Sequence, residues 1–394
     1  MKILYVSISS PWPVDAGYKV RMDGICRGLS RHHDLAYAFA GDSPIVRREC
    51  AQGAGNTYVL SREPATRRQK LLAKMRPSYG IYLSPREHNA FRKSFLRLCA
   101  ELDPDAVCFF QSATFWRVGP PPAGIPLIFD LDDLESKKNR RFAQSRSLFS
   151  RLWIAADGVR IRRMERDILN ASQVVLLSNP DDLPHVSSVT AASTVVVPNG
   201  FDFPEKLDTE SRQSHRLVLF GYMTYRPTRE GLMWFLDRVW PMITRAYPEA
   251  RIDVAGRYPS QMEALRSLRG VMLHGFLEEL DLLLDECAFL VVPVHVGAGT
   301  RIKILEAWSK GLPVVTTTIG CEGLGAVDGE TVLIGDTPKE FAGRCIELLD
   351  RPELGAELAE RAFQHGRANF DWEYIFPRID EAVGLATVRG RLPV

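Results

Sequence analysis

The stretch that decides the fold is "AFLVVPVHVGAGTRIKILEAWSKGLPVV", residues 288–315. An apolar run typical of a buried strand is followed by a glycine-containing loop, by an amphipathic helix predicted to begin near Thr300, and by a second apolar run. Gly297 and Gly299 would leave backbone N–H groups close to the positive end of that helix, where anions bind well. The segment therefore predicts a parallel-sheet unit with a phosphate-binding loop.

Short apolar runs alternate with helical patterns along nearly the whole chain, which indicates βαβ units and parallel sheets. The candidate strands are residues 2–8, 35–40, 106–110, 126–131, 173–178 and 193–198, then 216–222, 250–256, 271–275, 289–294, 312–317 and 330–335. We predict an α/β protein with two Rossmann-like domains, residues 1–200 and 201–375, and a C-terminal segment, 376–394, that could pack back on the first domain. Ligands of such sheets bind at the carboxyl ends of the strands, so the site is expected in a cleft between the domains.

Composition narrows the class of protein. The chain has 394 residues, of which 45% are hydrophobic and 25% charged, as in ordinary globular proteins. Its seven cysteines are odd in number and form no C-x-x-C pair, which favours reduced thiols of a cytoplasmic protein over disulfides or a zinc site. Nothing approaches the apolar length of a membrane span. The start, "MKILYVSISSPWP", is interpreted as a strand entering a loop, not as a signal peptide.

Charge is distributed unevenly. Residues 1–200 contain 28 Lys and Arg against 19 Asp and Glu, and the rest contains 22 against 29, so the halves carry +9 and −7. The excess suits an anionic partner of the first half, such as an anionic membrane surface, and no motif for reading nucleic acid accompanies it. Phe91, Phe95 and Leu98 have helical spacing beside basic residues. They could form a basic amphipathic surface or the core stripe of a surface helix.

Glu306 is the first candidate for ligand binding. Lys303, Glu306 and Lys310 share one side of the predicted helix. An exposed pair between Glu306 and Lys310 is the ordinary explanation. However, Glu306 lies about two turns from the glycine-flanked helix start, and a carboxylate is the usual partner of a ribose diol. We therefore predict that Glu306 contacts a ribose.

Four segments resemble one known family. "LEAWSKGLPVV" (305–315) resembles the donor-binding signature of GT-B glycosyltransferases, specifically the retaining nucleotide-sugar enzymes of glycosyltransferase family four, or group 1. "VVVPNGFD" (195–202) resembles the family's inter-domain signature. "LFGYMTYRPTREGLMWF" (219–235) resembles the first strand and helix of its donor domain, and "VMLHGFLEELDLLLDECAFLVVP" (271–293) the segment that places the nucleobase. The similarity covers residues 195 to 345 well and the amino-terminal third loosely.

The resemblance implies transfer of a sugar from a nucleoside diphosphate sugar to an acceptor hydroxyl with retention of configuration. In the family pattern a first Glu stands eight residues before Glu306, and here that position is Ala298. A subgroup with a similar Gly-x-Gly-Thr-Arg-x-Lys loop is often found with polysaccharide genes. In place of the missing Glu, we expect Arg301 and Lys303 to contact the diphosphate near the helix start.

The family's Gly-Arg-x4-Lys phosphate clamp is also missing. Arg226 or Arg229 is expected to replace it, although Arg226 before a proline could be a solvated loop residue. Two histidines follow strands of the second half. His295 enters the glycine loop and is the better site candidate, whereas His274 is more easily explained by packing.

The first domain offers two further groups. Gly17 resembles the family's glycine near donor phosphate and acceptor, and Arg21 would follow it on the helix; a capping loop that only starts the helix is the alternative. Asp130 and Asp132 end a strand and spell a D-x-D pattern that could hold a divalent ion. We expect them on the acceptor side, and we predict no metal and no cofactor.

The prediction is a GT-B glycosyltransferase of cell-surface polysaccharide or glycoconjugate synthesis. It would use a glycan or lipid-linked glycan acceptor, in the cytoplasm or at the inner face of the cell membrane. A nucleotide-sugar epimerase or phosphorylase of the same fold and a non-catalytic nucleotide-sugar-binding module are the alternatives. The predicted site comprises Arg301, Lys303, Asp130 and Asp132 for catalysis, Glu306, Gly297, Gly299, Thr300, Arg226, Arg229, His295, Gly275 and Phe276 for the donor, and Gly17 and Arg21 in the acceptor and phosphate loop.

Overall fold

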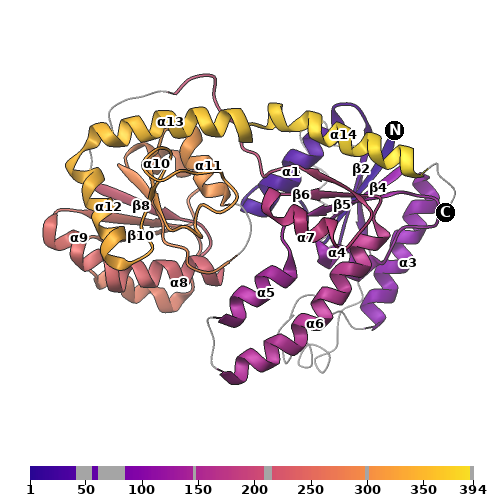
Figure 1. Ribbon diagram of the computed structural model, residues 1–394, viewed down its shortest axis with the longest axis horizontal. Helices are drawn as coiled ribbons and strands as arrows, with labels where there is room; N and C mark the ends of the chain where they lie inside the picture. The colour runs from indigo at the N-terminus through magenta and orange to yellow at the C-terminus, as the bar shows by residue number, and fades with distance from the viewer. Residues whose placement is uncertain (41–55, 61–84, 145–147, 208–214, 298–300, 391–394) are drawn as a thin grey trace. The chain divides into compact units, whose positions relative to one another are not determined.

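The chain forms two compact units, one made of residues 1–199 and 375–394 and the other of residues 200–374. The computed structural model describes residues 1–40, 56–60, 85–144, 148–207, 215–297 and 301–390 (Figure 1). Each unit contains one parallel sheet with helices on its faces, so the predicted α/β class with two Rossmann-like sheets is confirmed. No helix in these ranges combines the length and the apolar character needed to cross a bilayer.

The first unit is built on a seven-stranded sheet of order β3-β2-β1-β4-β5-β6-β7. Its strands are β1 (Lys2–Ser7), β2 (Asp34–Ala40), β3 (Thr57–Leu60), β4 (Ala106–Phe110), β5 (Leu127–Leu131), β6 (Val174–Leu177) and β7 (Ser193–Val196). Its helices are α1 (Gly17–Ser30), α3 (Pro85–Leu102), α4 (Ser112–Val118), α5 (Glu135–Gln144), α6 (Leu148–Ala171), the 3-10 turn η1 (Pro180–Asp182), α7 (Leu183–Ser187) and α14 (Trp372–Gly390) from Ile375 onward. All the strand runs predicted in this half are present, and β3 was missed.

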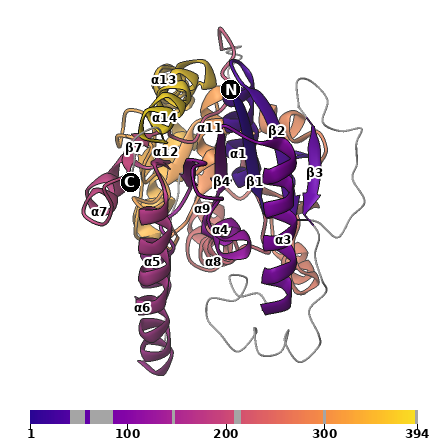
Figure 2. The ribbon, with the colours of Figure 1, turned by 90° about the vertical axis from the view of Figure 1, so that its right-hand side faces the viewer.

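Helices cover both faces of this sheet. Side chains of α3, α4 and α6 share one hydrophobic cluster with alternate residues of the strands. Phe91, Phe95 and Leu98 belong to that cluster, so the apolar side of α3 is a core stripe and not a free amphipathic surface. In the same unit α1 packs against α14, since a Cβ on Gly28 would lie 2.5 Å from Ile379 Cδ1. Figures 1 and 2 show α5 and α6 running side by side.

The second unit contains a six-stranded parallel sheet of order β10-β9-β8-β11-β12-β13. Its strands are β8 (Arg216–Phe220), β9 (Arg251–Ala255), β10 (Val271–Gly275), β11 (Phe289–Val292), β12 (Val314–Thr316) and β13 (Leu333–Ile334). Its helices are α8 (Arg226–Trp234), the π-helical turn η2 (Phe235–Val239), α9 (Trp240–Ala246), the 3-10 segment η3 (Ser260–Ser267), α10 (Leu280–Asp285), α11 (Ile302–Ser309), α12 (Pro338–Asp350) and α13 (Pro352–Phe370).

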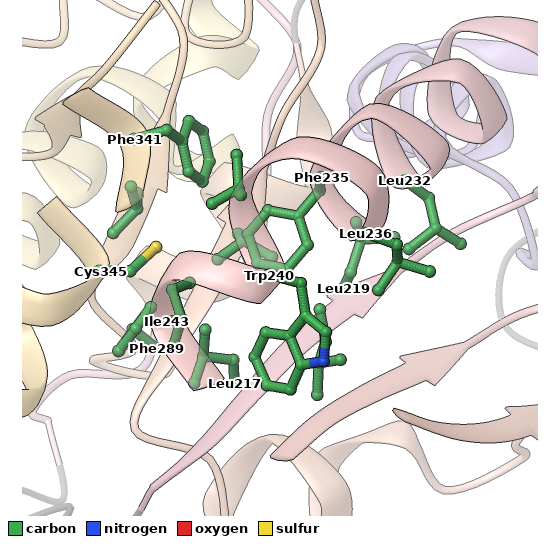
Figure 3. Packing of buried hydrophobic residues seen from close by; sticks show 14 of the residues in the cluster. Leu217, Leu219, Leu232, Phe235, Leu236, Trp240, Ile243, Phe289, Phe341 and Cys345 are labelled. Carbon is green, nitrogen blue, oxygen red and sulfur yellow. The ribbon is translucent and has the colours of Figure 1, made fainter. Parts of the chain in front are cut away.

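Aromatic packing fixes the helices of this unit on the sheet. Figure 3 shows one face, where the Phe235 ring lies between Phe341 of α12 and Trp240 of α9, in one cluster with strand residues such as Leu217. A second cluster on the other face holds α11 through Ile304, Leu305 and Trp308, among other side chains. With these three side chains buried in that cluster, the side of α11 that carries Lys303 and Glu306 is turned away from it.

Candidate active site

A row of glycines ends three adjacent strands of the second sheet. Gly221 follows β8, Gly256 follows β9 and Gly275 ends β10, with φ values of 128°, 126° and 75°. The Gly256 N–H donates to the Gly275 carbonyl at 2.6 Å, and a Cβ on Gly256 would lie 2.0 Å from the Gly221 carbonyl oxygen. Only glycine fits there. The carboxyl edge of β8 to β10 is therefore bare backbone, where a ligand can approach closely.

Lys303 places an ammonium group at one end of this glycine row. Its Nζ donates to the Phe220 carbonyl at 2.7 Å and lies 2.8 Å from where a Cβ on Gly221 would be. Burial lowers the pKa of Lys303 to about 8, with neighbouring Arg301 contributing and Glu306 opposing the shift. An ammonium has three donors, and the described residues provide an acceptor for one of them. Lys303 is thus a cation that can still bind an anion.

Glu306 lies one helical turn beyond Lys303 on α11. It is partly buried, and burial raises its pKa to about 7; Asp281 adds to the shift, while Lys310 and Lys303 oppose it. The ordinary explanation, a pair with Lys310, is not what the structure contains, because Lys310 Nζ pairs with Asp281 at 2.8 Å. The Glu306 carboxylate has no hydrogen bond or ion pair within the described part of the chain. It can accept hydrogen bonds from a ligand.

Arg301 and the loop before it complete the start of α11. The helix begins at Ile302, two residues later than expected, with Arg301 as its N-cap. Gly297 is buried with φ 144°, and a Cβ there would lie 2.7 Å from Arg301 Nη2. Glycine at this position therefore lets the guanidinium lie over the backbone. Gly299, Thr300 and Ala298 fall outside the described residues, so their contacts stay predictions.

The two histidines have different surroundings. His295 is half-buried and packs edge-on against Trp234, with ring centroids 4.3 Å apart. Burial lowers its pKa, with an opposing effect of Asp336, and its buried Nε2 has no hydrogen-bond partner among the described residues. His274 Nε2 instead lies 2.5 Å from Asp253 Oδ1; the residue is exposed, so the expectation that it is packed is wrong, and the contact with Asp253 holds its ring. His295 thus keeps an unused ring nitrogen in the loop after β11.

The two candidate arginines are located on α8. Arg226 is the first residue of that helix and not a loop residue, which corrects the alternative considered for it. Its Nε donates to Glu230 Oε1 at 2.6 Å, and Arg229 Nη1 lies 3.4 Å from the Met223 carbonyl. Both guanidiniums thus have local partners and can add a ligand contact only through their remaining N–H groups, so their role in binding stays a prediction.

Phe276 continues the glycine row beyond β10. Its ring is 48% exposed, and the guanidinium carbon of Arg257 lies 5.1 Å from the ring centroid. A planar, partly exposed ring supported by a guanidinium can stack on another flat group. The sequence interpretation named Gly275 and Phe276 but missed Arg257, which only the pairing of β9 with β10 brings beside them.

Arg21 and Asp130 form a buried ion pair in the first unit. Both side chains are fully buried, and Arg21 Nε donates to Asp130 Oδ1 at 2.9 Å. Arg21 Nη1 also donates to the Val197 carbonyl at 2.8 Å and to Asn199 Oδ1 at 3.1 Å. This corrects the expectation that Arg21 meets a phosphate and that Asp130 meets a reactant. The pair ties α1 to β5 and to the segment after β7.

Of the two carboxylates of the D-x-D pattern, Asp132 is the one that stays partly accessible. Burial, with Asp133 adding, raises the pKa of Asp132 to about 6. Gln111 Nε2 donates to Asp132 Oδ2 at 3.2 Å, and the Gln111 backbone adopts φ 62° and ψ 152°. Such a conformation is costly for a residue with a side chain and is often found at functional sites. The sequence interpretation missed Gln111, since only its position after β4 marks it.

Gly17 and the D-x-D pattern are the remaining candidates at the carboxyl edge of the first sheet. Gly17 begins α1, and Asp15 pairs with Lys19 at 2.7 Å. Because the Asp130 carboxylate is committed to Arg21, the D-x-D pattern does not present two free carboxylates. Within the described ranges no group of three or more His, Cys, Asp and Glu side chains is arranged to hold a metal ion.

Part of the chain is similar in sequence to known proteins. Residues 214–351 match the family model "Glycosyl transferases group 1". An "Uncharacterized 44.6 kDa protein in cps region" of Klebsiella pneumoniae is 25% identical over 249 residues, which are 60% of this chain and 63% of that protein.

Solved structures of the same architecture match nearly the whole chain. Sucrose-phosphate synthase from Thermosynechococcus elongatus superposes with a TM-score of 0.73 at 15% identity, covering 99% of this chain and 100% of that one. Anabaena HepE in complex with UDP and glucose gives a TM-score of 0.67 at 15% identity, covering 98% and 99%.

The two parallel sheets and these neighbours define the fold as that of GT-B glycosyltransferases. At the level of sequence, residues 214–351, which contain the second sheet, match the group 1 glycosyltransferases.

Proposed function

We propose that this enzyme transfers a sugar from a nucleoside diphosphate sugar to an acceptor hydroxyl with retention of configuration, in the synthesis of a cell-surface polysaccharide or glycoconjugate in the cytoplasm. The observation that carries the proposal is the pair of Lys303 and Glu306, one turn apart on α11 beside the glycine row. Two similarities support it. The Anabaena neighbour was solved with UDP and glucose, and the Klebsiella relative is named for a cps region.

The donor would lie along the glycine row. Its diphosphate would meet the Lys303 ammonium and the Arg301 guanidinium at the positive end of α11. Its ribose hydroxyls would donate to the Glu306 carboxylate, and its nucleobase would rest at Gly275 and Phe276. This order follows from the positions of the groups, because Lys303 adjoins the end of β8 and Phe276 follows β10, two strands away.

The cations would supply the main catalytic effect. When the bond between the sugar's anomeric carbon and the diphosphate oxygen breaks, negative charge grows on the leaving group. Fixed positive groups stabilise that charge better than water does, because they need no reorganisation. Lys303 is charged below about pH 8, given its lowered pKa. The proposal therefore assigns transition-state stabilisation to Lys303 and Arg301 and requires no enzymic nucleophile.

The acceptor hydroxyl would be oriented by the first unit. Asp132 is the partly accessible carboxylate at the end of β5, held by the Gln111 amide. With its pKa raised to about 6, it is ionised at neutral pH and can accept a hydrogen bond from a hydroxyl. The new glycosidic bond forms to the acceptor oxygen, whose proton leaves with the diphosphate.

Two measurements test the proposal together. A thermal-shift panel of UDP, GDP, ADP and dTDP should show one base that raises the melting temperature most, since a ligand that binds only the folded chain stabilises it. Turnover of the corresponding nucleotide sugar should then depend on added glycan acceptor, and proton NMR of the product should show the anomeric configuration of the donor. Turnover that is independent of any acceptor would instead indicate an epimerase or phosphorylase. No binding to any nucleotide would contradict the proposal.

A further inference from the structure

The helices on one face of the first sheet form a single layer. Figure 2 shows α4 between α3 and α6, and residue contacts join α3 to α4 and α4 to α6. All three bury side chains in the same hydrophobic cluster of that sheet face. The outward sides of α3 and α6 therefore point away from the sheet in the same general direction.

These outward sides carry mostly positive charge. Among the described side chains, the exposed ionisable residues of α3 and α6 are six basic and two acidic. They are Lys93, Arg97, Arg160, Arg162, Arg163 and Arg166 against Glu101 and Asp167. On α14, the described exposed residues from Ile375 onward include one basic residue, Arg378, and one acidic residue, Glu381. The positive excess thus belongs to one side of the unit.

Apolar side chains are exposed within the same positive surface. Leu96 on α3 is 36% exposed, one turn from Lys93 and next to Arg97. Val159 on α6 is 62% exposed, and Arg162 and Arg163 follow it one turn later. Helices that lie on a bilayer surface combine apolar side chains with a basic flank in this way.

We propose that the outward sides of α3 and α6, together called the basic face, dock this chain on an anionic lipid bilayer. The charge is complementary to anionic headgroups, and Leu96 and Val159 provide shallow apolar contacts. The buried stripe of Phe91 and Phe95 takes no part, because it is needed in the core. The inference goes beyond the proposed function, since docking needs neither donor nor acceptor.

Flotation of the full chain with vesicles tests whether the positive charge of the basic face binds anionic lipid. We expect it to float with vesicles of phosphatidylcholine and phosphatidylglycerol at low salt, and not with phosphatidylcholine alone. Each basic residue near an anionic surface contributes about fivefold to partitioning. The variants Arg162→Glu/Arg166→Glu and Lys93→Glu/Arg97→Glu should therefore each lose at least about 25-fold. The control Arg245→Glu/Lys339→Glu makes the same net charge change with exposed residues of the second unit and should bind like the parent.

Tryptophan fluorescence tests whether the basic face is the part of the chain that contacts the bilayer. Val159→Trp should shift its emission to the blue on phosphatidylglycerol vesicles, because the indole leaves water. Val388→Trp, placed on α14 where Val388 is 66% exposed, should not shift. Nucleotide binding by the charge variants should equal that of the parent, which separates failure of docking from failure of the proposed function.

Three results would overturn the proposal. One is absence of flotation of the parent with anionic vesicles at low salt. Another is an equal loss in the basic-face variants and the Arg245→Glu/Lys339→Glu control. The third is binding to a soluble polyanion such as heparin without binding to vesicles, which would assign the basic face to a different partner.

Discussion

The carboxyl edges of the two sheets use charge in opposite ways. At the edge of the first sheet, Arg21 and Asp130 are fully buried and pair through Asp130 Oδ1, while Asp130 Oδ2 has no hydrogen-bond partner among the described residues. At the edge of the second, Lys303 and Glu306 lie a turn apart on one helix, and each keeps hydrogen-bonding capacity that the described chain does not use. Both pairs look alike as charged residues near strand ends. The first holds the fold together, and the second is available to a ligand.

The largest effect is expected from breaking the buried pair. Arg21→Met leaves the Asp130 carboxylate buried without a partner, which costs about 3–5 kcal/mol of unfolding free energy. Denaturant unfolding measures it. The double variant Arg21→Met/Asp130→Leu should recover much of the loss, because no charge is then stranded. The control Arg226→Met removes a partly exposed pair with Glu230 and should change stability by less than about 1 kcal/mol. If Arg21→Met were as stable as Arg226→Met, the pair would not be structural.

At the second edge, Lys303→Ala should change binding more than stability. Loss of a charged hydrogen bond to the diphosphate should weaken nucleoside diphosphate binding by about 1.5–3 kcal/mol. The bare nucleoside should bind as to the parent. Calorimetric titration of both ligands measures the difference. Lys310→Ala is the matched control, because Lys310 caps the end of the same helix but pairs with Asp281. An equal loss for nucleoside and diphosphate would show that Lys303 only holds the helix.

Glu306→Ala should weaken the binding of the nucleoside and of its diphosphate equally, by about tenfold, because the lost contact is to the ribose. The sharper measurement compares each nucleotide with its 2′-deoxy form. The parent should prefer the ribose form, and the variant should lose that preference. Glu230→Ala, on α8, serves as the control. The melting temperature should stay close to that of the parent. A preserved ribose preference in Glu306→Ala would exclude this role.

The pH dependence of nucleotide-sugar binding distinguishes the two charges. Burial raises the pKa of Glu306 to about 7 and lowers the pKa of Lys303 to about 8. Affinity should therefore be highest between these values, fall below about pH 7 as Glu306 takes up a proton, and fall above about pH 8 as Lys303 loses one. Lys303→Arg should abolish the alkaline fall, and Glu306→Gln the acid one. An unchanged alkaline fall in Lys303→Arg would refute the assignment.

The same two groups make the unfolding free energy change with pH in opposite directions. Between the ordinary pKa of a glutamate and about 7, the folded chain binds more protons at Glu306 than the unfolded chain, so stability falls as pH rises. Between about 8 and the ordinary pKa of a lysine, the unfolded chain binds more protons at Lys303, so stability rises with pH. Thermal melts without ligand would record both slopes.

The smallest effect on stability is expected from a substitution of Gln111, at the carboxyl edge of the first sheet. Gln111→Gly removes a side chain from a backbone conformation that glycine adopts easily, so the unfolding free energy should stay within about 1 kcal/mol of the parent or rise. Acceptor-dependent turnover should fall, because the Asp132 carboxylate loses the Gln111 amide. Donor binding should not change. A large loss of stability would show that the Gln111 conformation is not strained.

Much of the fold was predictable because the strands are buried on both faces and are therefore continuous apolar runs. The edge strand β3 was missed, since "TYVL" is short and only Leu60 is fully buried. The spacing of Lys303 and Glu306 on one helix side was also predictable, because three residues make nearly one turn. Their predicted contacts with a donor await the experiments above.

Long-range pairing was not predictable. Arg21 and Asp130 are 109 residues apart, and nothing in either neighbourhood marks them as partners. Arg257 and Phe276 meet only because β9 and β10 are adjacent. A single sequence also did not decide whether the apolar or the basic side of α3 faces outward. The structure decides it through the burial of Phe91 and Phe95.

The close packing of α14 on α1 has a consequence for synthesis on the ribosome. Phe376 and Ile379 lie within van der Waals contact of a side-chain position at Gly28, yet they are translated after the whole second unit. The nascent first unit must therefore wait, with this apolar face of α1 uncovered, until the last part of the chain emerges. The second unit is contiguous, so it needs no later part of the chain to be complete.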